Sequence, residues 1–206
     1  MPIKSKKTGG GDGPAPWFGI QRAGIVDFTN EAGKYEWADV YLRIKLSVEG
    51  SKFERDLKII GSFEKDTSGM IQDCTLLRRI NGLADAMGWE GGVNAKGQWV
   101  NKDDELISNI SEYLTGKFGS TPIEDPSFDY LVYIYPKAAK DGKSYNEVHP
   151  RIMKNIPGNA TELQRYIDYM KSNGFLKEAK VDNMPDATNG AMKPSNSTED
   201  FTIDSL

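Results

Sequence analysis

The chain has 206 residues, with 26 basic and 30 acidic side chains, one Cys, one His and a formal charge of −4 at neutral pH. This length is enough for one sizeable hydrophobic core. A single Cys excludes an intramolecular disulfide framework, and Cys74 with His149 cannot supply the four ligands of a zinc site made only of Cys and His. No apolar run approaches the roughly 18 residues of a membrane span, and Met1–Gly13 lacks the apolar segment of a signal peptide. We therefore expect a cytoplasmic protein that uses no metal or other cofactor and binds no membrane.

The negative charge is concentrated at the C-terminus. Residues 181–206 contain five acidic residues and one basic residue, so 25 residues of each sign remain in residues 1–180, which are neutral as a whole. Residues 1–16 are rich in Lys, Gly and Pro, and the C-terminal segment is rich in Asn, Ser, Thr and Asp. Segments of this composition bury too little apolar surface to fold. The composition predicts a disordered basic arm over 1–16, one folded domain over 17–180, and a disordered acidic tail over 181–206.

Alternating side chains predict a β-hairpin in the first third of the domain. In Ala38–Glu49, apolar residues at even-numbered positions from Val40 to Val48 alternate with Tyr41, Arg43, Lys45 and Ser47, which is typical of a half-buried strand. After a turn at Gly50-Ser51, a second strand is expected in which Phe53, Arg55, Leu57 and Ile59 share one face. An earlier strand is expected over Phe18–Phe28.

Helical and strand patterns alternate in the rest of the domain. Apolar residues at helical spacing end at Gly88, where a C-cap glycine would stand. Acidic residues in a first turn favour a second helix from Asp103, and the spacing of Asn159 and Glu162 is that of a capping box. The expected elements are a helix over Leu76–Met87, an insert over about 89–128 with a helix over Asp103–Lys117, strands over Asp129–Tyr135 and Ser144–Ile152, and a helix from about Asn159 to Gly174.

This element order predicts the fold class. Three strands, a helix, a helical insert, two strands and a terminal helix form the order of a mainly β protein with a five-stranded oligonucleotide/oligosaccharide-binding (OB) barrel. The strand–helix alternation of a parallel α/β sheet is absent. The terminal helix and an acidic tail are expected to follow the barrel.

Signatures of an enzyme are weak. His149 has no nucleophile-elbow Ser or Cys beside it, so the sequence offers no triad. Alternating charges on one strand face are compatible with a metal-dependent nuclease, although any solvated strand face gives the same spacing. The residues of that alternative site are Asp39, Glu54, Asp56 and Lys58.

Basic and aromatic residues gather on the predicted β segments. Residues 41–65 hold six basic against four acidic residues and residues 133–154 hold five against two, whereas residues 89–129 hold three against eight. Cations that follow phosphates and rings that stack on bases are the means by which proteins bind single-stranded nucleic acid without sequence preference. The candidate DNA-binding residues, on three strands and two loops, are Lys34, Tyr35, Trp37, Tyr41, Arg43, Lys45, Arg55, Lys58, Tyr133, Tyr135, Lys137, Lys140, Lys143, Tyr145 and Arg151.

Three segments resemble a known family. The strand pair YLRIKLSVEGSKFERDLKII, the helix LLRRINGLADAMGW and the pair YLVYIYPKAAKDGKSYNEVHPRI are similar to the small single-stranded-DNA-binding replication proteins of bacteriophages, over residues 18–153. The resemblance implies an OB barrel that coats exposed DNA strands during replication and recombination in an infected cell, without enzymatic activity.

The end of the chain, STEDFTIDSL, is loosely similar to the acidic tails of such proteins. The resemblance implies a tail that recruits replication or recombination proteins. Physically, a tethered anion of this kind can occupy the basic groove when DNA is absent and be released to a polymerase or helicase when DNA binds. Its candidate residues are Glu199, Asp200, Phe201, Asp204 and Leu206. For this segment, the alternative is a plain tail that only increases solubility. For the whole protein, the alternative besides the nuclease is a barrel that binds a protein of the replication machinery instead of DNA.

Overall fold

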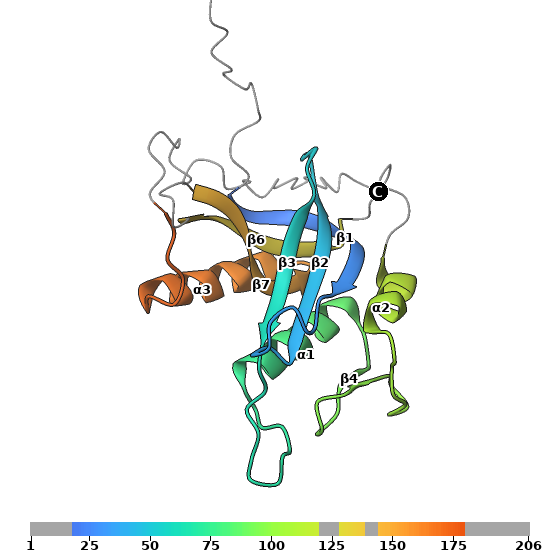
Figure 1. The fold of residues 1–206 in the computed structure, drawn as a ribbon. Coiled ribbons are helices and arrows are strands. Elements are labelled where there is room, and N and C mark those ends of the chain that lie inside the picture. The colour runs from blue at the N-terminus through green and yellow to red at the C-terminus, as the bar shows by residue number, and fades with distance from the viewer. Residues whose placement is uncertain (1–17, 120–127, 139–143, 180–206) are drawn as a thin grey trace, which may run out of the picture.

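Five strands close into one β-barrel in the computed structural model, which describes residues 18–119, 128–138 and 144–179 (Figure 1). The barrel order is β1-β2-β3-β7-β6, and β6 pairs with β1 to close it. Neighbouring strands are antiparallel except β3 and β7, which run parallel and meet at Leu57 and Val148. This arrangement confirms the predicted OB barrel. The barrel strands are β1 (Gly19–Asn30), β2 (Val40–Val48), β3 (Arg55–Gly61), β6 (Tyr130–Ala138) and β7 (Ser144–Lys154).

The alternation predicted for the first hairpin is confirmed over β2 and at Leu57 and Ile59 of β3. The apolar side chains of β2 from Val40 to Val48 are buried inside the barrel together with Leu57 and Ile59 of β3. Arg43 and Lys45 lie on the outer side and pair across the ladder with Lys58 and Asp56. Successive side chains of a strand point to opposite faces, so this hairpin has one core face and one face toward solvent.

Helix α1 (Thr75–Met87) closes one end of the barrel (Figure 1). Its buried side chains, such as Ile80 and Leu83, belong to the barrel core. Gly88 ends the helix in the left-handed conformation, with a φ of 67°, and its backbone N–H bonds the last turn. The predicted C-cap glycine is confirmed.

The insert differs from the prediction. Helix α2 (Ile110–Phe118) begins well after Asp103, because the Asn109 side chain accepts a hydrogen bond from the backbone N–H of Glu112 and caps the helix there. The acidic residues near Asp103 belong to a hairpin loop instead. A short unpredicted hairpin, β4 (Gly92–Val93) with β5 (Trp99–Val100), precedes that loop.

Three loops near the insert share one design. In each, an Asp or Asn side chain accepts backbone hydrogen bonds from the residues two and four positions later, and the fourth residue of the loop has a positive φ. Such side-chain bonds compete with helix formation, which explains the late start of α2. The loops begin at Asp66, Asn94 and Asn101, with positive φ at Gly69, Gly97 and Asp104.

Helix α3 (Asn159–Ser172) packs on the outer side of β6. Its buried residues Leu163 and Ile167 form a second apolar cluster with Tyr133 and Tyr135. The predicted capping box is wrong: Gly158 is the N-cap residue, and the Asn159 side chain donates to the carbonyl of Lys154 instead. None of the helices in the described ranges combines the length and apolar character that crossing a bilayer requires.

The contact between the loop of the β4–β5 hairpin and Ile71 can be tested by substitution. Gly97 has a φ of 86°, and a Cβ there would lie 3.3 Å from Cδ1 of Ile71. We expect Gly97→Ala to lower the free energy of unfolding by about 1–2 kcal/mol, because the new side chain meets both backbone strain and a neighbour. Urea unfolding measures this, with Gly92→Ala as the matched control, since a Cβ at Gly92 meets nothing within 4 Å. Equal losses in the two variants would contradict the expectation.

Candidate functional site

An aromatic cluster joins the β1–β2 loop to the start of β2. The cluster consists of Tyr35, Trp37 and Tyr41. The ring of Tyr35 stacks with that of Trp37 at 5.8 Å between centroids and with that of Tyr41 at 5.7 Å. Tyr41 is buried beneath the loop, whereas Trp37 is 60% exposed. The structure therefore brings three predicted site residues together and leaves one large ring open to solvent.

One hydrogen bond within the loop and one from the residue after β3 hold this loop in place. The Lys34 ammonium donates to the Glu31 carboxylate at 2.8 Å and lies 5.3 Å from the Tyr41 ring centroid. This hydrogen bond holds the pKa of Glu31 below its usual range, and nearby Arg43 adds to the effect. The Ser62 hydroxyl donates to the carbonyl of Trp37. The cluster is thus held in place before any ligand arrives.

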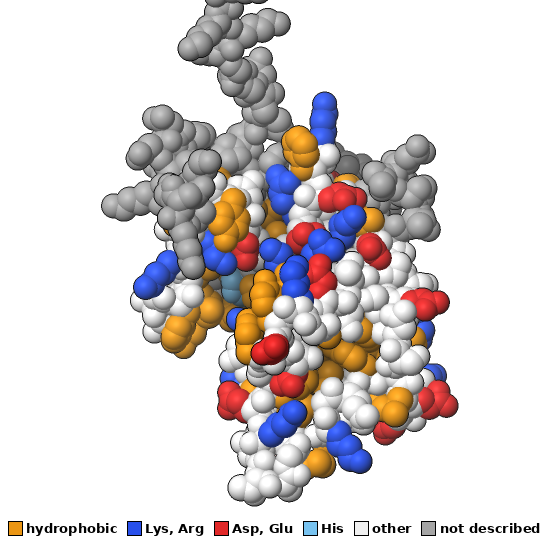
Figure 2. Space-filling model, viewed as in Figure 1, with side chains coloured by type: hydrophobic (Ala, Val, Ile, Leu, Met, Phe, Trp, Pro, Cys, Tyr) orange, Lys and Arg blue, Asp and Glu red, His pale blue; other side chains and the backbone are white. Residues whose placement is uncertain are grey.

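Charges of both signs cover the outer side of β2 and β3, which we call the front face together with the β1–β2 loop. Arg43 lies 3.1 Å from Glu31 and 3.7 Å from Asp56, and Lys45 lies 3.4 Å from Glu54. Figure 2 shows basic and acidic side chains intermingled over these strands. Lys58 has no ion pair within the part of the chain that the structure describes. The front face therefore carries predicted cations, but most of them have an acidic partner.

The predicted tyrosines of β6 do not belong to the front face. Tyr133 is 5% exposed, and its hydroxyl donates to Glu178 at 2.7 Å. Burial raises the pKa of Tyr133 far above its usual range, with the Glu178 bond adding to it. Tyr135 is likewise buried beneath α3. No ring face of these two residues is open for stacking on a base, which departs from the sequence prediction.

The residues predicted on β7 are spread along the strand. Tyr145 is exposed and pairs across the ladder with Lys137, whose ammonium lies 3.2 Å from Glu147. Arg151 pairs with Glu162 and lies over the ring of Tyr166 on α3. Lys140, Lys143 and the candidate tail residues lie outside the described residues.

The prediction that Phe53 lies on the same strand face as Leu57 and Ile59 is wrong. The strand β3 begins only at Arg55, so Phe53 lies in the β2–β3 turn and is 70% exposed. The Arg55 guanidinium lies 5.9 Å from the Phe53 ring centroid. The sequence signal for this position was the closeness of Phe53 to the turn, which the apparent alternation of side chains hid.

The four residues of the nuclease alternative are not gathered. Asp39 accepts a hydrogen bond from the backbone N–H of Phe63 at one end of the β2–β3 pair. Glu54 lies at the opposite end, beside Arg55, which pairs with Leu46. No group of three or more possible metal ligands occurs among the described residues. This geometry gives no support to a metal centre built on Asp39 and Glu54.

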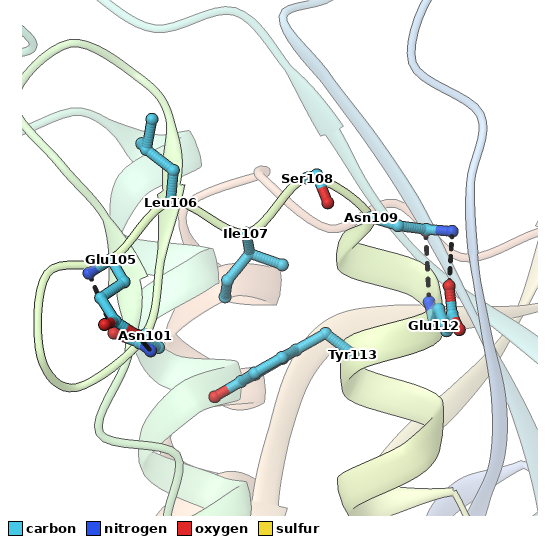
Figure 3. A pocket seen from close by; sticks show the side chains of 8 residues that line it. All are labelled: Asn101, Glu105, Leu106, Ile107, Ser108, Asn109, Glu112 and Tyr113. Atoms are coloured by element: carbon cyan, nitrogen blue, oxygen red, sulfur yellow. Dashed lines mark hydrogen bonds between the residues drawn. The ribbon is translucent and has the colours of Figure 1, made fainter.

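An open hollow of about 330 Å³ lies on the insert (Figure 3). Leu106, Ile107 and Tyr113 form its apolar part, and the carboxylates of Glu105 and Glu112 lie at its rim. Carboxylates repel phosphate, so this hollow does not extend a nucleic-acid surface.

Comparisons of the chain with models of protein families, with curated proteins and with solved structures gave no match. The resemblance to phage DNA-binding proteins therefore remains a prediction. Because one fold serves many functions, the function is argued from the residues of the front face.

His149 lies in the middle of β7, against Tyr166 of α3, and is 5% exposed. Its Nδ1 accepts a hydrogen bond from the backbone N–H of Arg151 at 3.1 Å, and its ring meets the Tyr166 ring edge-on. Burial lowers the pKa of His149 to about 4, and the charges of Arg79 and Arg151 act in the same direction. Because the neutral ring accepts at Nδ1, its proton stands on Nε2.

This shift predicts a loss of stability in mild acid. The unfolded chain binds a proton at His149 near pH 6.5 and the folded chain near pH 4, so the free energy of unfolding falls as the pH decreases through this window. Between pH 7.5 and 5, we expect His149 to lower the free energy of unfolding of the wild type by about 2 kcal/mol. His149→Asn should lack this decrease, and its amide oxygen can replace Nδ1 as hydrogen-bond acceptor. Urea unfolding at both pH values measures the difference, and NMR of the chain's single His gives its pKa directly. A measured pKa near 6.5 would contradict the expectation.

Proposed function

We propose that the protein binds single-stranded DNA without sequence preference through the front face. The observation that carries this proposal is the preformed aromatic cluster, with Trp37 exposed, beside the cations Lys34, Arg43 and Lys58 on an OB barrel. A base stacked on an aromatic side chain contributes about 1–3 kcal/mol and any base can supply it. The resemblance to phage proteins supports a role in phage replication and recombination.

Ion pairs on the front face are compatible with phosphate binding. Exposed ion pairs contribute about 0–1 kcal/mol, so a phosphate can replace a carboxylate as the partner of Arg43 or Lys45 at little cost. Lys58 needs no such exchange. The acidic residues nevertheless reduce the positive potential, and we expect moderate rather than extreme salt dependence.

We also propose that the acidic tail competes with DNA and recruits replication proteins. The backbone N–H of Ala179 donates to the carbonyl of Pro136 at 2.8 Å, beside Lys137 at the end of β6. A tail that continues from Ala179 therefore begins at the end of β6 that carries Lys137. Tethering gives its carboxylates a high effective concentration at that end.

The first test is a titration of fluorescently labelled oligo-dT at two salt concentrations. We expect the wild-type affinity to fall with salt at a log–log slope of roughly −3, as for about four phosphate contacts with a single strand. Trp37→Ala should weaken binding about tenfold by removing one stacking ring. The matched control is Tyr169→Ala, which removes a ring that is 58% exposed but lies on α3.

Three outcomes would overturn this proposal. They are a binding isotherm that does not change with salt, equal affinity for duplex and single strands, and equal losses for Trp37→Ala and Tyr169→Ala. The first would exclude phosphate contacts, the second would exclude preference for unpaired bases, and the third would place the stacking site elsewhere.

A second test uses the charge of the front face. Glu54→Gln removes a carboxylate 3.4 Å from the Lys45 ammonium, so we expect oligo-dT to bind about two- to fivefold more tightly at low salt. The gain should shrink at high salt because screening weakens exposed charges. Asp85→Asn on α1 is the control, since it makes the same change of net charge away from the front face. A weakened affinity in Glu54→Gln but not in Asp85→Asn would contradict the expectation and show that the Glu54 carboxylate contributes to binding.

A further inference from the structure

The β2–β3 hairpin extends beyond the barrel at the end opposite α1 (Figure 1). Its turn contains Gly50, with a φ of 73°, followed by Ser51, Lys52 and Phe53. Lys52 is exposed, and Phe53 is among the most exposed large apolar side chains of the described residues. A Phe in this position buries little surface on folding, so core packing does not account for it.

Local bonds hold the Phe53 backbone in a defined conformation. The Ser51 hydroxyl accepts a hydrogen bond from the backbone N–H of Phe53 at 3.1 Å and donates to its carbonyl at 3.0 Å. The Arg55 guanidinium lies beside the ring, and its Nη1 donates to the Glu54 carbonyl. Nε of Arg55 is buried without a hydrogen-bond partner in the described structure. A ring and a cation are thus presented together at the tip.

We propose that Phe53, with Lys52 and Arg55, is a second base-stacking site, so that a single strand runs along the β2–β3 hairpin from the aromatic cluster to its tip. This inference rests on the proposed function and adds the path of the ligand. The cations Arg43, Lys45 and Lys58 lie on the outer side of the hairpin between the two ends. They are placed to follow the phosphates of a strand that stacks at both ends.

The register sets the distance between the two stacking sites. Tyr41 pairs with Ile60, which lies seven positions after Phe53. At about 3.4 Å per extended residue, Phe53 lies at most about 24 Å along the hairpin from Tyr41, which is joined to the open ring of Trp37 through Tyr35. A stacked strand advances about 3.4 Å per nucleotide, so it needs about seven nucleotides to reach from one site to the other.

The test measures the affinity of oligo-dT as a function of length, from 4 to 20 nucleotides, for wild type, Phe53→Ala and Phe53→Trp. We expect Phe53→Ala to bind oligomers shorter than about seven nucleotides as wild type does, and to bind longer ones about tenfold more weakly. Phe53→Trp retains a ring and should match wild type at every length. Thermal unfolding of each variant serves as the folding check.

Each outcome decides the inference. No effect of Phe53→Ala at any length would overturn it, and so would an equal loss for short and long oligomers, because neither fits two sites about seven nucleotides apart. A loss in Phe53→Trp as large as in Phe53→Ala would exclude stacking. If wild type binds no oligomer at all, the proposed function itself fails; if Trp37→Ala weakens binding while Phe53→Ala does not, only the second site fails.

Discussion

Closure of the barrel decides which surface is left for a ligand. Because β1, β2, β3, β7 and β6 form a closed order, the inner side of every strand faces one core, and each outer side must be covered or meet water. Helix α3 covers β6, and α2 lies against β1, where the Thr115 hydroxyl bridges Asp27 and the backbone N–H of Phe28. Helix α1 closes an end of the barrel. The outer side of β2 and β3 meets water, and the candidate site is found there.

The composition of that open side follows from the same constraint. A solvated strand face must be polar, and like charges directly opposite each other in a ladder are unfavourable. Lys45 faces Asp56 across the β2–β3 ladder, while Arg43 faces Lys58 but has Glu31 and Asp56 as ion-pair partners. A neutral face of this kind is stable without a ligand, and its exposed ion pairs can still exchange partners with phosphates.

The sequence alone predicts correctly those elements whose hydrophobic periodicity has a single cause. Alternation in β2 has a single origin, burial of one face, and both the strand and its inner residues are predicted correctly. The run YLVYIY on β6 is apolar throughout because both faces are buried, so its tyrosines could not be assigned to a solvent face. The predicted start of α2 is wrong for another reason. The Asn101 side chain accepts backbone hydrogen bonds that favour a loop, although the acidic residues there resemble a first helical turn.

The candidate site shows the same division between pattern and three-dimensional context. Sequence spacing identified Trp37 and Lys34 as loop residues but could not show that Tyr35 stacks with both Trp37 and Tyr41. Because Tyr41 is buried and Tyr35 already contacts two rings, Trp37 offers the most open aromatic surface of the cluster. A hydrogen bond within the loop, from Lys34 to Glu31, and one from Ser62 to Trp37 hold the loop in place, so in the proposed function little conformational entropy would be lost when a base stacks on it. In the function proposed above, an open ring face would favour unpaired bases of any identity over a duplex, whose bases are already stacked on one another.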